Sequence, residues 1–262
     1  IGAQQRARPL AGIFCGGDLF HAGPLDAAVR RAAQQRCEAH GAQVFGGDVV
    51  HHQSSAQEGF QLLACCFTAV GLQENPDVPI IACVSRLVGH KGFSLVTDSL
   101  QEIMGLDVQM VVLGTGDWQY EEAFRHAQSQ YPGRFAAQLT YSAPLSTMIY
   151  AGADLFLMPS VSEPCGLSQM IAMRFGTIPV VRETGGLKDT VVPYNKFDGT
   201  GRGFTFANIN AGDMVWVLRE AVDLYHSNKK AWRALQREGM TADFSWDNSA
   251  RQYLDIYQRI LG

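Results

Sequence analysis

Short apolar runs alternate with helix-like stretches along most of this chain, and the alternation limits the folds open to it. The runs are four to seven residues long and cover 78–84, 108–113, 135–141, 155–158 and 178–181, and a further edge strand is expected at 203–206. Helical patterns are expected at 91–104, 120–130, 144–151, 211–226, 229–240 and 246–261. Strands that are apolar throughout and separated by helices are typical of a doubly wound parallel α/β sheet.

One strand–turn–helix stretch, residues 158–176, combines features of a ligand site. An apolar run leads into a polar loop, 160–166, after which apolar residues recur at helical spacing. Backbone N–H groups at such a helix start lack internal partners and favour an anion. Glu163 lies in the same loop and would repel phosphate, so it should face an uncharged, hydroxyl-rich part of a ligand. The alternative interpretation is that Glu163 only complements the helix dipole.

Two cations flank the turn that follows the first predicted strand. Arg86 and Lys91 belong to the sequence Ser-Arg-Leu-Val-Gly-His-Lys-Gly at 85–92, which contains no acidic residue. Ligands of parallel sheets bind outside the carboxyl ends of the strands. A planar guanidinium and a compact ammonium together suit a diphosphate. A solvated surface position is the alternative for both side chains.

Two glycine turns follow other predicted strands. Gly114 and Gly116 stand in Gly-Thr-Gly-Asp, but the third glycine of a dinucleotide-binding fingerprint is absent because position 119 is Gln. We interpret this turn as one that lets the backbone approach a ligand closely. Thr184 and Gly185 open the second turn, whose N–H groups could contact an anion or a hydroxyl. Alternatively, Lys188 and the following Asp cap the next helix.

Four motifs occur in the order found in one enzyme family. The stretch SEPCGLSQ at 162–169 resembles the EPCGL motif of bacterial glycogen synthases and plant starch synthases. The stretches SRLVGHKG at 85–92, YAGADLFLMPS at 150–160 and RETGGLKDTV at 182–191 agree with the same family. The resemblance runs from about residue 71 to residue 262 and covers the C-terminal, nucleotide-sugar-binding half. It implies the Rossmann-like C-terminal domain of a GT-B glycosyltransferase.

The resemblance implies an activity and roles for individual residues. The reaction would move glucose from ADP-glucose to an α-1,4-glucan with retention, without a metal or other cofactor. Arg86 and Lys91 would stabilise the departing ADP, Glu163 would hold glucose hydroxyls, and Tyr141 would stack on adenine. The N–H groups of Leu167 and Ser168 would hold the distal phosphate. The remaining nucleotide-sugar contacts would come from Gly114, Gly116, Cys165, Gly166, Thr184 and Gly185.

Three positions bear on how closely the chain follows the family. Gly89 and His90 replace the Gln or Asp-Gln that usually precedes the lysine, a change that bears on the contacts around Lys91. Thr140 replaces the glycine before the tyrosine, a change that bears on the loop that fits the base. Met170 stands where many related retaining transferases carry a second glutamate, as expected for the glycogen-synthase branch. In the family, the last helix crosses back toward the other domain.

Residues 1–70 differ from the rest of the chain. They contain no Lys, Tyr or Trp, and the acceptor-side half of the resembling family is not recognisable in them. A divergent or poorly ordered leader is one interpretation, and translation in a wrong frame is the other. The chain would therefore need the family's missing N-terminal half as a partner.

Bulk properties narrow the classes of partner and compartment. A net charge of -4 argues against a general nucleic-acid partner, and the lack of a long apolar run argues against a membrane span. Six cysteines without CxxC spacing and the absence of a recognisable secretory signal predict a cytoplasmic protein. No metal-ligand spacing is visible. Rival functions are a UDP-sugar-dependent transferase, a non-catalytic nucleotide- or glucan-binding protein and, more distantly, an NAD-dependent dehydrogenase.

Overall fold

The computed structural model describes residues 70–261, which form a parallel sheet with helices on both faces. The interpretation of residues 1–70 as a leader therefore falls outside the described residues, apart from Val70. Across the described range, no helix combines the length and apolar character that crossing a bilayer would need.

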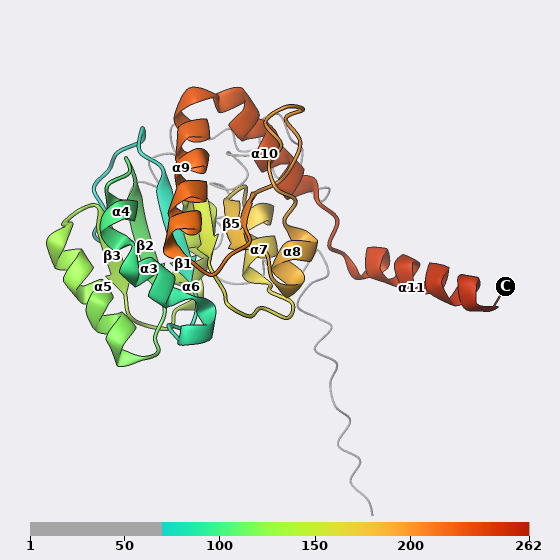
Figure 1. The fold of residues 1–262 in the computed structure, drawn as a ribbon, viewed down its shortest axis with the longest axis horizontal. Coiled ribbons are helices and arrows are strands. Elements are labelled where there is room, and N and C mark those ends of the chain that lie inside the picture. The colour runs from blue at the N-terminus through green and yellow to red at the C-terminus, as the bar shows by residue number, and fades with distance from the viewer. Residues whose placement is uncertain (1–69, 262) are drawn as a thin grey trace, which may run out of the picture.

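Six strands make up the sheet, and their order confirms the doubly wound topology. All neighbours pair in parallel, in the order β3-β2-β1-β4-β5-β6. The strands are β1 (Ile80–Val84), β2 (Gln109–Leu113), β3 (Phe135–Gln138), β4 (Leu155–Met158), β5 (Ile178–Arg182) and β6 (Phe204–Phe206). The direction of winding reverses between β1 and β4, which lie at the centre (Figure 1). A switch point of this kind opens a crevice at the carboxyl ends of the strands.

Alternating side chains divide the sheet's apolar residues between two layers. Ile81 and Cys83 face one layer and Ala82 the other, as the two-residue period of a strand requires. The first layer holds α3 (Phe93–Asp98), α4 (Leu100–Met104), α5 (Trp118–Gln130) and α9 (Ala211–Ser227), and the second holds α6 (Ala143–Gly152) and α7 (Ser168–Arg174). The helix α10 (Lys229–Thr241) packs against both α9 and α7. The short helix α8 (Gly185–Thr190) packs beside α7 and β5.

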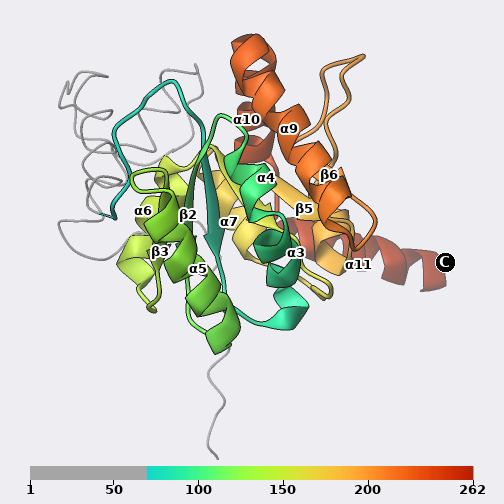
Figure 2. The same cartoon turned by 60° about the vertical axis from the view of Figure 1, so that its left-hand side comes forward.

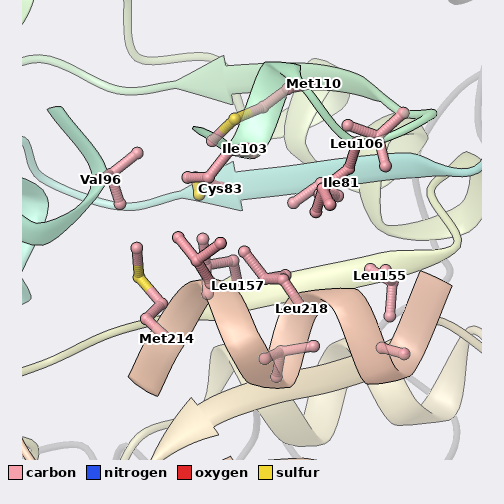
Figure 3. Packing of buried hydrophobic residues seen from close by; sticks show 14 of the residues in the cluster. Ile81, Cys83, Val96, Ile103, Leu106, Met110, Leu155, Leu157, Met214 and Leu218 are labelled. Atoms are coloured by element: carbon pink, nitrogen blue, oxygen red, sulfur yellow. The ribbon is translucent and has the colours of Figure 1, made fainter. Parts of the chain in front are cut away.

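The largest buried cluster lies between the sheet and α9. Figure 3 shows Met214 and Leu218 of α9 directed toward Leu155 and Leu157 of β4, with Cys83 of β1 above them. All five side chains are at most 2% exposed. This packing holds the central strands rigidly, so the loops at their carboxyl ends start from fixed positions.

Two predicted elements differ from the structure. The helix expected at 91–104 is divided into a 3-10 turn (Gly89–Lys91), α3 and α4, because Gly92 has a φ of 76° and Ser99 leaves the helical region. The strand expected at 135–141 ends at Gln138. Tyr141 consequently lies outside the sheet, next to Ser142, whose side chain caps α6.

The last helix lies apart from the domain. α11 (Trp246–Leu261) has no buried residue and extends away from the sheet and its helices, as Figures 1 and 2 both show. Its apolar side chains recur at helical spacing and stay in solvent: Tyr253, Leu254, Ile256, Tyr257, Ile260 and Leu261. An amphipathic helix with an uncovered apolar face normally packs on another surface.

Candidate functional site

The loops that follow β1 and β4 meet at the switch point of the sheet. The amide of Val161 donates to the carbonyl of His90 at 2.9 Å, which joins the two loops directly. Gly92 lies so close to Pro159 that a Cβ atom built on it would be 1.9 Å from the Pro159 carbonyl oxygen. Lys91 and Glu163 are therefore brought together by backbone contacts on both sides of them.

Lys91 and Glu163 form an ion pair at the centre of this junction. The Lys91 Nζ atom lies 2.5 Å from Glu163 Oε2, and the two side chains are 18% and 10% exposed. The hydroxyl of Ser160 donates to the same carboxylate oxygen at 3.2 Å. Within residues 70–261, Glu163 Oε1 has no hydrogen-bond donor, so this oxygen is available to a ligand hydroxyl.

This pair changes the interpretation of the two cations. The sequence shows no acidic residue near Arg86 or Lys91, but the fold supplies one to Lys91 from 72 residues away. Arg86 remains exposed and makes no ion pair within the described part of the chain. The two cations are thus not equivalent: Lys91 is held in place by protein, whereas Arg86 is free to follow a ligand.

The carbonyl groups of the 160–166 loop face donors from the protein. The Glu163 carbonyl accepts from the amide of Gly186 at 3.2 Å, and the Gln169 side-chain amide donates to the carbonyls of Cys165 and Gly166 at 3.4 and 2.8 Å. A peptide's N–H points opposite to its C=O, so the two Gln169 contacts turn the amides of Gly166 and Leu167 away from the interior. Inside the described range, the amides of Gly166, Leu167 and Ser168 have no acceptor.

The glycine turns serve close contacts within the protein. A Cβ on Gly114 would be 1.8 Å from the Ser85 carbonyl oxygen, and one on Gly116 would be 2.1 Å from that of Leu87. Gly185 follows Thr184, the N-cap of α8, and has a φ of +43°. A Cβ on Gly185 would be 2.2 Å from the Glu163 carbonyl oxygen. In the described residues these glycines let loops of the site approach one another, and their contact with a ligand stays a prediction.

The structure contradicts the alternative that Lys188 and the following Asp cap the helix after the second glycine turn. Helix α8 begins at Gly185, so Lys188 lies in its last turn and cannot cap its start. Instead, the Lys188 Nζ atom lies 4.0 Å from Glu183 Oε2, and both side chains are partly in solvent. The turn thus owes its shape to the glycines and to the backbone of the Glu163 loop.

Tyr141 and Cys165 reach the solvent near this edge. Tyr141 follows β3 and is 89% exposed, so its ring is free to stack on a planar group. Cys165 is exposed, whereas Cys83 is buried in the core, and this burial raises the pKa of the Cys83 thiol to about 12. Of the two cysteines in the described part of the chain, Cys165 is therefore the one that a reagent in solution can reach, and the loop places it two residues after Glu163.

Two residues of the site were missed in the sequence. Arg182, the last residue of β5, donates to the carbonyls of Ser160 and Val161, and Gln169 holds the other end of the loop. A charged residue ending an apolar strand was the available signal for Arg182. For Gln169, the available signal was a polar residue one helical turn before the apolar pair Ala172 and Met173, with which it shares a buried face. Within residues 70–261, no group of three His, Cys, Asp or Glu side chains could hold a metal ion.

The contact between Gly92 and Pro159 gives a stability test with a matched control. Gly92 and Gly199 have nearly equal φ values, 76° and 74°, but a Cβ on Gly199 would meet nothing within 4 Å. We expect Gly199→Ala to lower the free energy of unfolding by about 1–2 kcal/mol through backbone strain. Gly92→Ala should cost about 1–3 kcal/mol more, as overpacking does. Urea denaturation measures both, and equal losses would contradict the steric role of Gly92.

Comparison with known proteins gives the class that this fold and site define. Residues 69–236 match the family model described as glycosyl transferases group 1. The match covers more than half of the chain, and the chain belongs to this family.

Within the family, the chain is similar to glycogen and starch synthases. It is 50% identical over 191 residues to the glycogen synthase of Geobacillus stearothermophilus and 49% identical over 186 residues to that of Desulfitobacterium hafniense. These matches cover 73% and 71% of this chain but 39% and 40% of the relatives. The chain thus spans about two fifths of the length of these curated relatives, consistent with a C-terminal portion.

Solved structures agree with this placement. The catalytic domain of starch synthase IV from Arabidopsis thaliana, bound to ADP and acarbose, superimposes with a TM-score of 0.67 at 34% identity, covering 76% of this chain and 43% of that one. The sucrose-phosphate synthase of Thermosynechococcus elongatus shares the fold, with a TM-score of 0.53 at 21% identity. This superposition covers 72% of this chain and 47% of the sucrose-phosphate synthase chain.

Proposed function

We propose that residues 70–261 are the donor half of a retaining glucosyltransferase that moves glucose from ADP-glucose to the non-reducing end of an α-1,4-glucan. The observation that carries the proposal is the Lys91–Glu163 pair at the switch point. The pair puts a cation beside a carboxylate that keeps one oxygen free for hydroxyls. The similarity to a starch synthase with bound ADP supports adenine as the base.

The proposed donor lies along the carboxyl edge of the sheet. Lys91 contacts the diphosphate while it remains near Glu163, and Arg86 approaches the same phosphates from solvent. The amides of Leu167 and Ser168 receive the distal phosphate, because no acceptor from the part of the chain that the structure describes occupies them. Glu163 Oε1 accepts from glucose hydroxyls, and Tyr141 covers the adenine ring.

The chemistry asked of this half is stabilisation of the leaving group. As the bond between the anomeric carbon and the ADP oxygen breaks, negative charge grows on the diphosphate, and the glucan hydroxyl forms the new bond to that carbon and passes its proton to an oxygen of the departing diphosphate. A positioned cation and backbone amides at that place stabilise the developing charge without reorganising. Because Glu163 holds Lys91, the ammonium already points toward the proposed diphosphate position before the donor binds.

The exposed face of α11 supports a requirement for a second half. The helix α11 lies outside the donor domain, and the apolar side chains between Tyr253 and Leu261 are exposed to solvent. We place the acceptor-side half of the enzyme against this face. That half would bring the glucan end to the sugar and exclude water from the anomeric carbon.

Nucleotide binding tests the donor assignment. By calorimetry, we expect ADP to bind and UDP to bind more weakly, because the proposed base contact is a large exposed ring that favours the larger purine surface. Adenosine should bind much more weakly than ADP, because it lacks the phosphates. Preference for UDP would support a UDP-sugar transferase, and failure of both nucleotides to bind would contradict the proposed donor site.

A further inference from the structure

Arg182 holds the start of the Glu163 loop through all three of its guanidinium nitrogens. Its Nε donates to the Ser160 carbonyl at 2.8 Å, its Nη2 to the Val161 carbonyl at 2.6 Å, and its Nη1 to the Ala207 carbonyl at 3.2 Å. Among residues 70–261 it has no carboxylate partner, so its hydrogen-bonding capacity goes to backbone.

These contacts lead directly to the ion pair. Ser160, whose carbonyl Arg182 fixes, also donates its hydroxyl to Glu163 Oε2, the oxygen that Lys91 contacts. A rotation of the peptide between Ser160 and Val161 would move this hydroxyl and the chain that leads to Glu163. The planar fork of an arginine fits two successive carbonyls, which the single ammonium of a lysine cannot match with the same geometry.

We propose that Arg182 is a positioning residue that sets the geometry of the Lys91–Glu163 pair. It touches neither of these two side chains and acts through the backbone of the loop and the Ser160 hydroxyl. The pair itself is an observation, whereas the consequence for nucleotide binding rests on the proposed function. The two parts of the proposal therefore need separate measurements.

The chain contains a matched control for this role. Arg134 also donates to three backbone carbonyls, those of Met104, Leu106 and Val108, at 2.9–3.1 Å. It directly precedes β3 and so lies at the amino-terminal edge of the sheet, opposite the candidate site. All three bonds come from the Nη2 atom of Arg134, so replacing this residue removes arginine-to-backbone contacts, though not a fork, without touching the Glu163 loop.

The first measurement needs no ligand. The coupling between Lys91 and Glu163 is obtained from a double-mutant cycle of Lys91→Met and Glu163→Gln, by denaturant unfolding. The cycle is repeated in chains carrying Arg182→Lys or Arg182→Gln, and in one carrying Arg134→Lys. We expect the coupling, expressed as a ratio of unfolding constants, to fall toward one in both Arg182 backgrounds and to persist with Arg134→Lys. Equal coupling in all backgrounds would overturn the proposal.

The second measurement uses ADP and adenosine with the same single variants. A misplaced Lys91 ammonium weakens its hydrogen bond to the charged diphosphate, and full loss of such a bond costs about 10- to 150-fold, so we expect ADP affinity to fall roughly 10- to 100-fold with Arg182→Lys. Adenosine affinity should stay unchanged, and Arg134→Lys should bind both ligands as the unaltered chain does. If Arg134→Lys weakens ADP by the same factor, the effect is general destabilisation and the positioning role is wrong. If the unaltered chain binds no ADP, the proposed function fails, while the coupling measurement still decides the role of Arg182.

Discussion

The 262-residue chain is expected to bind ADP but to transfer glucose about 10⁵- to 10⁸-fold more slowly than an intact synthase. In a two-domain transferase, both reacting groups must be oriented together, and orientation contributes roughly 7–11 kcal/mol to lowering the barrier. The described residues provide contacts for a diphosphate and a sugar through Lys91 and Glu163. In this range the apolar face of α11 has no protein partner that would bring an acceptor. Calorimetry with ADP and incorporation of labelled glucose into glycogen measure the two properties in one preparation.

A chimaera gives the matching positive control. The half of the Geobacillus stearothermophilus glycogen synthase that precedes its matched segment is fused ahead of residue 71, since the two proteins are 50% identical over 191 residues. We expect the fusion to regain transfer that the chain alone lacks, and the same fusion with Glu163→Gln to lose it again. Transfer at the intact rate by the 262-residue chain would contradict the requirement for a second half and would give residues 1–69 a role in the reaction.

Replacing Lys91 with Met is expected to weaken ADP binding about 10- to 150-fold. A hydrogen bond to a charged group contributes roughly 1.5–3 kcal/mol, and Met keeps a similar length without the charge. Adenosine, which lacks the phosphates, should bind as it does to the unaltered chain. Calorimetry with both ligands makes the comparison, and equal losses for the two would mean that the substitution damages the fold.

Glu163→Gln should have a different pattern. It removes the charge that holds Lys91 but keeps the shape of the side chain and an oxygen that accepts hydrogen bonds, so ADP binding should weaken less than with Lys91→Met. The gain in affinity from ADP to ADP-glucose should fall, because Glu163 is the proposed sugar contact. A loss of ADP binding equal to that of Lys91→Met would show that Glu163 acts only by holding the lysine.

The stability of the same variants provides an internal check. Lys91→Met leaves the 10%-exposed Glu163 carboxylate without its cation, and breaking a buried pair from one side costs about 3–5 kcal/mol. Because the ammonium is partly in solvent, a smaller loss is expected here. The double variant should be more stable than Lys91→Met alone, since it removes the unpaired charge. Thermal unfolding of the three proteins beside the unaltered chain measures this order.

Several features of the fold followed from local sequence patterns. Apolar runs with helices between them predicted the parallel sheet, because strands buried on both faces must be apolar throughout. Five of these runs and the edge strand became β1 to β6 in the predicted positions. The helix broken at Gly92 and the early end of β3 were missed, because a contact with Pro159 and the course of the chain toward α6 decided them.

The candidate site also combines groups that local sequence predicts with contacts that only the tertiary structure decides. Residues that bind through their own chemistry, such as the cations after β1 and the carboxylate after β4, were recognisable one loop at a time. Strand order then placed those two loops side by side at the switch point. Local sequence patterns therefore identified candidate groups but did not predict the distances between them.

By itself, the sequence determined the fold class, the family and three charged candidates at the carboxyl edge, Arg86, Lys91 and Glu163, because periodicity and motifs are properties of neighbouring residues. The tertiary structure alone decided that Glu163 pairs with Lys91, that Arg182 holds the Glu163 loop, and that the face of α11 remains bare. Each of these depends on the three-dimensional path of the whole chain. The physical reason is that an ion pair or a carbonyl contact forms only where folding brings distant segments within about 3 Å.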